Sequence, residues 1–319
     1  MRLDSPLFPP LDCNEFGHLA VGDGHEIYWE EAGQPDQPVL CILHGGPGGG
    51  IRPYYRRLFD PQKWRAILFD QRGCARSRPQ GALDANTTAD LVQDMERLRI
   101  ARGVDQWVVL GGSWGSTLAL AYAQAHPERC AGLIVTGVYL ARREDRDWWW
   151  FGAGALYPEL HAELARALPM DERADLRAAY LRRILDSRPD VHVPALQALL
   201  TYETQLLDVL PNPARLEGLM ADPATVAMGR IFAHYEAHDH FLSENALIDG
   251  AHRLAGVPGW IINGRFDACT PPAGAFALAQ AWPQARMRIM PLSAHTWNDP
   301  ILGYAIGEAL ADLRGRLAC

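Results

Sequence analysis

A serine set between glycines is the residue of this sequence that most strongly indicates chemistry. Ser113 stands in the string GGSWG at positions 111–115, which matches the pattern G-x-S-x-G. An apolar run precedes it and a stretch with helical spacing follows, and the pattern requires this strand–turn–helix context. Small neighbours permit the sharp turn, and the following helix points its unpaired N–H groups at the serine. We therefore predict that Ser113 is a nucleophile; the alternative is a purely structural Gly-Ser turn.

Two polar residues late in the chain are suited to activate Ser113. A serine hydroxyl needs a neighbouring base, and in this arrangement the chain order is serine, acid, histidine. Asp267 and His295 each follow a short apolar run, so both are expected at the same edge of a sheet as Ser113. We predict that His295 accepts the serine proton and that Asp267 orients its ring. Asp299, four residues past His295, is the competing acid.

A glycine-rich loop is the candidate for binding negative charge that develops on a substrate oxygen. The string HGGPGGG at residues 44–50 directly follows an apolar run. Such charge is stabilised by backbone N–H groups, and we expect one from Trp114 and the other from Gly46. A phosphate-binding loop is disfavoured, because no Gly-Lys-Ser/Thr follows and the spacing is not G-x-G-x-x-G. A turn that needs only flexibility is the remaining alternative.

The elements that must position these groups follow from apolar periodicity. Short apolar runs that alternate with helical stretches are typical of a parallel sheet covered on both faces. The expected strands are 25–31, 39–43, 65–69, 107–110, 132–136, 260–262 and 287–290. The expected helices of this part are 88–102, 114–125, 273–282 and 300–317. The pattern predicts an α/β fold with a mostly parallel central sheet.

A block of different character interrupts this alternation. From about residue 141 to 243 the chain is rich in Ala, Leu, Arg and Glu, as in 169–185 and 194–207. This composition favours helices with proline-containing breaks. We therefore divide the chain into a core of residues 1–139 and 246–319 and a helical cap of residues 140–245. An insertion of this kind often covers a site at the carboxyl ends of the strands.

Two side-chain clusters lie within the cap. His234, His238 and His240 are close in sequence, but no H-E-x-x-H pattern is present, so surface or packing roles are favoured over a metal site. Trp149 belongs to an aromatic run at residues 148–151 that fits either the core of the cap or a pocket wall. We expect neither a metal nor a cofactor.

Composition excludes several classes of protein. The 319 residues are 48% hydrophobic and 21% charged, which is ordinary for a globular protein, and the net charge is −8. A nucleic-acid binder would carry a basic face, so that class is disfavoured. No run of eighteen apolar residues predicts a membrane helix, and the first residues lack the apolar stretch of a signal peptide. Scattered cysteines without a CxxC pair favour reduced thiols and a cytoplasmic location.

Taken with these motifs, the chain resembles the bacterial proline iminopeptidases, or prolyl aminopeptidases, of the α/β-hydrolase superfamily. The resemblance runs over almost the whole chain and rests chiefly on HGGPGGG together with GGSWGSTLALAY at residues 111–122. It implies that an N-terminal proline is cleaved from a peptide through an acyl-enzyme, without a cofactor. It also implies Ser113 as nucleophile, His295 as base and Asp267 as orienting acid.

The resemblance further implies that glutamates of the cap bind the free N-terminal amine. Glu203 is retained, whereas Phe232 stands where the family has a second glutamate, in the string RIFAHY. If residues 224–241 are helical, Glu236 shares a face with Phe232 and can restore the charge while Phe232 packs on the proline ring. The alternatives are that Glu203 is a surface charge, and that Glu236 faces solvent beside an apolar pocket.

Two functions therefore stay open at this point. The first is a serine aminopeptidase that acts on small peptides with an N-terminal proline. The second is an esterase or amidase of the same superfamily with altered acyl specificity, for which an amide or ester needs no free amine. The Arg-Gly pair that the family carries after the fourth strand, here Thr136 and Gly137, is a further departure from its pattern.

Overall fold

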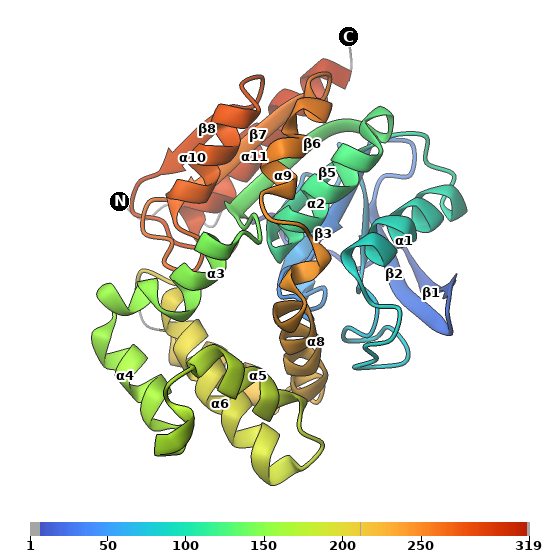
Figure 1. Cartoon of the computed structure of the whole chain (residues 1–319). Helices are drawn as coiled ribbons and strands as arrows, with labels where there is room; N and C mark the ends of the chain where they lie inside the picture. Colours follow the sequence, from blue (N-terminus) through green and yellow to red (C-terminus); the bar gives the residue numbers. More distant parts are fainter. Residues whose placement is uncertain (1–6, 211, 318–319) are drawn as a thin grey trace.

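In residues 7–210 and 212–317, which the structure describes, the computed structural model of this chain is built around one eight-stranded sheet. Its strand order is β1-β2-β4-β3-β5-β6-β7-β8 (Figure 1). The pairs β1–β2 and β2–β4 are antiparallel and the other pairs are parallel, which confirms the predicted α/β fold with a mostly parallel sheet. The strands are β1 (Glu15–Gly22), β2 (His25–Gly33), β3 (Val39–Leu43), β4 (Arg65–Phe69), β5 (Trp107–Ser113), β6 (Cys130–Val138), β7 (Gly259–Gly264) and β8 (Arg286–Met290).

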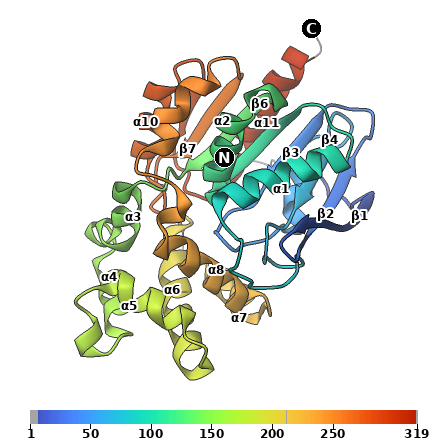
Figure 2. The ribbon, with the colours of Figure 1, turned by 45° about the vertical axis from the view of Figure 1, so that its right-hand side comes forward.

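The two faces of the sheet pack against separate apolar layers. Along β3, Leu40 and Ile42 belong to one buried cluster, whereas Cys41 and Leu43 belong to the other. Successive side chains of a strand point to opposite faces, so an unbroken apolar run is what a strand buried on both sides requires. The helices α1 (Thr88–Ala101), α2 (Trp114–Ala125) and α10 (Pro272–Ala281) cover one face, and α11 (Pro300–Leu317) covers the other (Figure 2).

The first strand of the sheet has no counterpart among the predicted elements. β1 forms an edge of the sheet and pairs only with β2. Its residues are mostly exposed or half-buried, and Gly17 and His18 interrupt its apolar pattern. An edge strand with little buried surface lacks the alternation by which a strand is recognised, so only its pairing with β2 defines it.

Helices fill the segment between β6 and β7. They lie together beyond the carboxyl ends of the strands, at the bottom of Figure 1, and bury a third apolar cluster that also includes Ala268 and Cys269 of the loop after β7. They are α3 (Arg143–Trp150), α4 (Pro158–Arg166), α5 (Leu176–Leu185), α6 (Pro189–Leu206), α7 (Pro213–Ala221) and α8 (Thr225–Ala237), and the short α9 (Ala246–Asp249) follows. None of the described helices is long and apolar enough to span a bilayer.

Helix boundaries in the cap differ from the predicted ones in physically informative ways. The helix expected from residue 194 begins at Pro189, whose ring suits the first turn, and it tolerates Pro194 in its second turn. The helix expected over 169–185 begins only at Leu176, where Asp175 caps its N-terminus. The helix expected over 224–241 ends at Ala237, because the backbone leaves the helical region at Asp239, His240 and Phe241, whose φ values are 51°, 58° and 54°.

Candidate active site

Ser113 lies on the tight turn that joins β5 to α2. Its φ is 56° and its ψ is −131°, a conformation that residues other than glycine rarely adopt. The surrounding glycines are required by close packing: a Cβ at Gly111 would lie 2.0 Å from the carbonyl oxygen of Gly115. A Cβ at Gly115 would in turn lie 2.6 Å from the carbonyl oxygen of Leu43. The turn therefore holds the serine at the carboxyl edge of the sheet.

Asp267 and His295 meet at the same edge, from the loops after β7 and β8. The ring nitrogen Nδ1 of His295 lies 2.8 Å from Oδ2 of Asp267, and both side chains are almost fully buried. Asp267 also accepts hydrogen bonds from Thr270, at 2.8 Å from its N–H and 3.0 Å from its hydroxyl. Thr270 was not identified from the sequence as a partner of Asp267. The signal for it was its position three residues after this aspartate, from which a threonine can donate to the carboxylate.

The competing acid has a different role. The two carboxylate oxygens of Asp299 accept from the N–H of Ile301 at 2.8 Å and from that of Ala294 at 3.3 Å. A carboxylate that accepts from backbone N–H groups at the start of a helix acts as a cap, in this case for α11. The geometry thus places Asp267, and not Asp299, beside the ring of His295.

The backbone at the end of β6 packs against the side chains of Asp267 and His295. Gly137 has a φ of 48°, and a Cβ there would lie 3.1 Å from Nδ1 and Cε1 of His295. The N–H of the next residue, Val138, donates to the buried side chain of Asn263 at 2.8 Å. A glycine is therefore needed where the backbone passes the imidazole, and Asn263 holds that backbone against the loop after β7.

The charge state of His295 depends on two opposing effects. Burial disfavours the imidazolium and by itself would lower the pKa of His295, whereas the carboxylate of Asp267 stabilises the imidazolium through its charge and hydrogen bond. Together with weaker influences, these effects raise the pKa of His295 above its ordinary value of 6.5. Ser113 and His295 border one cavity, although no hydrogen bond joins their side chains in the described part of the chain.

The glycine loop after β3 lies against Ser113. A Cβ at Gly45 would sit 3.3 Å from Cβ of Ser113, and Gly46 borders the same cavity as the serine. Gln71 links this loop to α2: its amide nitrogen donates to the carbonyl of His44 at 3.1 Å and its oxygen accepts from the Trp114 indole at 2.8 Å. Gln71 is thus a positioning residue, which the sequence did not single out.

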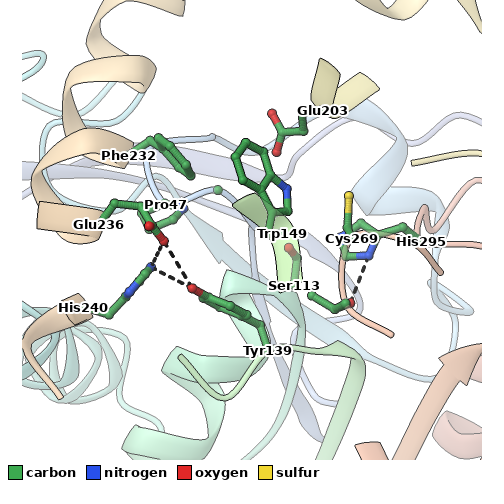
Figure 3. A pocket seen from close by; sticks show the side chains of 12 residues that line it. Pro47, Ser113, Tyr139, Trp149, Glu203, Phe232, Glu236, His240, Cys269 and His295 are labelled. Atoms are coloured by element: carbon green, nitrogen blue, oxygen red, sulfur yellow. Dashed lines mark hydrogen bonds and ion pairs between the residues drawn. The ribbon is translucent and has the colours of Figure 1, made fainter. Parts of the chain in front are cut away.

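Aromatic side chains of the cap form one wall of the cavity (Figure 3). The rings of Trp149 and Phe232 have centroids 5.8 Å apart, and both border the cavity. Trp150, by contrast, is fully buried in the cap. The aromatic run therefore serves both of the roles considered for it, because adjacent residues of α3 point to different sides. Cys269 completes the wall, and burial raises the pKa of its thiol.

Two glutamates reach the cavity from different helices, Glu203 from α6 and Glu236 from α8 (Figure 3). Within the described residues, the Glu203 carboxylate has neither a hydrogen bond nor an ion pair. Burial raises the pKa of Glu203, and the charges of His295 and Arg215 oppose this rise only partly. Glu203 is therefore not the surface charge of the alternative interpretation but a carboxylate at the cavity without a cationic partner.

Glu236 is also turned inward, and four side chains already contact its carboxylate. It is 3% exposed and accepts from the Trp150 indole at 2.9 Å, and Arg177 forms an ion pair with it at 3.3 Å. Tyr139 and His240 lie 3.3 and 3.4 Å from its other oxygen. The alternative that Glu236 faces solvent is thus wrong, and the charge it brings is offset by Arg177.

Two histidines of the cap, His234 and His240, take part in packing, whereas His238 is exposed. The ring of His234 lies 3.1 Å from the carbonyl oxygen of Asn86 and 5.0 Å from the ring of Phe241. His240 is buried beside Glu236, and burial lowers its pKa to about 4 despite the nearby carboxylate. Over residues 7–210 and 212–317, no group of three or more His, Cys, Asp or Glu side chains is placed to hold a metal ion.

The family model and the related proteins that match this sequence agree with each other. Residues 38–298 match the family described as alpha/beta hydrolase fold. The chain is 39% identical to a proline iminopeptidase of Arabidopsis thaliana over 92% of its own length and 78% of that protein. It is 40% identical to a proline iminopeptidase of Xylella fastidiosa, over 92% and 95% of the two chains.

Solved structures of other proteins have the same fold as this chain. A proline iminopeptidase-related protein of Thermus thermophilus superposes with a TM-score of 0.63 at 25% identity, over 94% of this chain and 98% of that one. An esterase from Rhodococcus superposes with a TM-score of 0.66 at 18% identity, over 93% and 98% of the two chains. At the latter identity the likeness concerns the fold alone.

Proposed function

The chain belongs to the proline iminopeptidase family of α/β hydrolases, and on that premise we propose that it releases N-terminal proline from peptides through an acyl-enzyme. The observation that carries the proposal is the position of Glu203. It borders the cavity that Ser113 and His295 border, and no cation of the described chain pairs with its carboxylate. A buried ammonium needs such a partner, so the cavity suits a free N-terminal amine.

The proposed reaction begins with attack by Ser113. Its Oγ attacks the carbonyl carbon of the proline residue, and its proton passes to Nε2 of His295, while Asp267 holds the opposite nitrogen of the ring. The carbonyl oxygen becomes an oxyanion, which the N–H groups of Gly46 and Trp114 stabilise. His295 then donates its proton to the leaving amine, the C–N bond breaks, and an ester joins Ser113 to proline.

Hydrolysis of that ester completes the cycle. A water molecule gives a proton to Nε2 of His295 and attacks the ester carbonyl, and the second oxyanion is held by the same N–H groups. Collapse returns the proton to Oγ of Ser113 and releases free proline. No cofactor enters either half of this scheme, and each proton is transferred through the one histidine.

Recognition of the proline residue involves the cap. Its secondary ammonium pairs with Glu203, and the aromatic ring of Phe232 packs on the pyrrolidine ring. Glu236 serves as a second acceptor, weakened by its ion pair with Arg177. A charge-assisted hydrogen bond contributes about 1.5–3 kcal/mol, so Glu203 supplies much of the discrimination in favour of a free amine.

An esterase or amidase without a demand for a free amine is the second candidate. It is favoured by Phe232 at a family glutamate position and by the ion pair that offsets Glu236. Three substrates separate the two functions: a prolyl arylamide, its N-acetyl derivative and a simple aryl ester. We expect kcat/KM to be highest for the free prolyl arylamide and to fall about ten- to a hundredfold on acetylation. Equal turnover of the blocked and free amides would favour the second candidate.

A further inference from the structure

A second cavity meets the first at Ser113. Gly46, Ser113, Glu203 and His295 border both cavities. Because the reacting carbonyl must lie at Ser113, the two sides of the scissile bond occupy different cavities. The first cavity, with its aromatic wall, takes the proline residue in the function proposed above. The second therefore receives the part of the peptide that leaves.

The two cavities differ in charge. The first is bordered by the carboxylates of Glu203 and Glu236, whereas the second is bordered by the guanidinium groups of Arg52 and Arg215. The only acid that borders the second cavity, within the described residues, is the shared Glu203. The leaving side is thus lined by two cationic groups and does not include Glu236.

Each of the two arginines is held by an aspartate and still has an N–H group without a partner in the described part of the chain. Arg52 is held by Asp222 through Nη1 at 2.8 Å, and Arg215 by Asp208 through Nη2 at 2.7 Å. Neither of these aspartates borders the second cavity. The side chains of Arg52 and Arg215 are 43% and 21% exposed respectively, so a ligand can reach both. In the described part of the chain, Nη2 of Arg52 and Nη1 of Arg215 have no hydrogen-bond partner.

A planar guanidinium with unused N–H groups is well suited to a carboxylate, which it binds through charge and paired hydrogen bonds. In a dipeptide cleaved after its first residue, the residue that leaves carries the C-terminal carboxylate, two bonds from the scissile nitrogen. Arg52 and Arg215 line the same cavity as Ser113 and His295. A carboxylate bound in that cavity therefore belongs to a very short leaving group.

We infer that Arg52 and Arg215 bind the free C-terminal carboxylate of the leaving residue, and that the preferred substrates are dipeptides with an N-terminal proline. This inference rests on the proposed function, because it takes the proline residue to occupy the first cavity. It adds the class of substrate: short peptides from the final steps of peptide breakdown, and not the N-termini of long chains.

The test compares prolylalanine with its C-terminal amide, prolylalaninamide, in the wild-type enzyme. The two substrates differ in the terminal charge, and we expect kcat/KM to be about tenfold or more higher for the free acid. Arg52→Gln and Arg215→Gln should each reduce this ratio, and the double variant should bring it close to one. Arg215→Lys should retain part of the preference, because it keeps the charge and loses the paired geometry.

Controls separate this inference from the proposed function. A prolyl arylamide has no carboxylate and reports whether each variant still folds and reacts. Arg188→Gln removes an exposed arginine of the cap that pairs with Asp186 and borders neither cavity, so its acid-to-amide ratio should stay at the wild-type value. A wild-type ratio near one, with the arylamide still cleaved, would overturn the inference and leave the proposed function standing. Failure to cleave any prolyl substrate would overturn both.

Discussion

At the scale of single residues, Ser113 combines an unfavourable backbone conformation with a position between two cavities. A non-glycine residue at positive φ persists only where the surrounding structure enforces it, and such strain is concentrated at functional sites. Gly111 and Gly115 enforce it here by their close approach. The proposed chemistry therefore depends on a hydroxyl that a strained turn holds between the two cavities.

Replacement of this side chain tests the nucleophile directly. Ser113→Ala should lower kcat by on the order of a millionfold while the melting temperature stays within a few degrees of the wild type. The loss is large because the remaining residues have no group to form the ester. A fluorophosphonate probe should label the wild type and not the variant, as read by intact-protein mass spectrometry. A Ser113→Ala enzyme that still turns over prolyl arylamide would rule the residue out.

The pH dependence of the rate reports on His295. Only the neutral ring can accept the proton of Ser113, and the pKa of His295 is raised above 6.5, so kcat/KM should rise with pH and level off only above that value. Asp267→Asn removes the charge that stabilises the imidazolium. The rising limb should then move to lower pH, and the plateau should fall by about four orders of magnitude. A limb that keeps its position in the variant would contradict the pairing.

The two glutamates of the cavity form a matched pair for testing amine recognition. Glu203→Gln removes an unpaired carboxylate, so kcat/KM for prolyl arylamide should fall about ten- to a hundredfold, with little change for a simple aryl ester. Glu236→Gln removes a carboxylate that Arg177 already offsets, and its effect on the same substrate should be smaller. Equal losses on amide and ester would show that Glu203 does not bind the amine.

At the scale of secondary-structure elements, the turn between β5 and α2 is the most demanding junction of the site. Gly115 in α2 lies so close to the end of β3 that an added Cβ would meet the Leu43 carbonyl oxygen at 2.6 Å. The backbone of β3 cannot move away from an added methyl group as the end of a flexible side chain can. Helix α2 can therefore present its N-terminus to Ser113 only where it carries no side chain at this position.

Two glycines in helices separate this packing effect from helix propensity. Gly115→Ala should destabilise the protein by several kcal/mol, because the new methyl group must displace a strand. Gly307→Ala, in α11, has no atom within 4 Å of the added Cβ, and alanine is favoured over glycine in a helix by about 0.8–1 kcal/mol. Urea unfolding should show a loss for the first variant and a small gain for the second. Similar effects for both would exclude the steric explanation.

At the scale of the whole molecule, His240 marks the junction between sheet, covering helices and cap. Its ring lies 5.5 Å from that of Trp114 and within reach of Tyr139 and Glu236, and its carbonyl accepts from Thr88 at 2.6 Å. These neighbours belong to α2, the end of β6, α8 and α1. A buried neutral histidine at such a junction couples the stability of the fold to pH.

The sign of this coupling follows from its depressed pKa. Unfolded His240 gains a proton below about 6.5, but the folded residue gains one only near 4, so stability falls as pH drops between these values. The contribution reaches roughly 3 kcal/mol at 1.36 kcal/mol for each pKa unit. His240→Asn tolerates the positive φ and does not titrate. The variant should lose less unfolding free energy between pH 7 and pH 5 than the wild type, as measured in urea; an equal loss would exclude His240 as the source.

Much of the fold was readable from local patterns. The strands 39–43 and 65–69 and the helices 114–125 and 300–317 coincide with their predicted bounds, because each carries a continuous or periodic apolar pattern. The chain order of Ser113, Asp267 and His295 was readable as well, since each residue directly follows a predicted strand. Parallel strands place their carboxyl ends at one edge, so local signals were sufficient to bring these residues together.

Contacts between distant residues decided the rest. Arg177 reaches Glu236 across 59 positions and Gln71 reaches Trp114 across 43, and neither pairing leaves a trace in local periodicity. The sequence alone determined which residues stand at the edge of the sheet, because that depends on the period of the chain. Only the tertiary structure decided which carboxylate has its charge neutralised and which arginines border the cavity for the leaving group. It also decided which glycine cannot be replaced by a residue with a side chain. These properties depend on the neighbours that packing brings next to each residue.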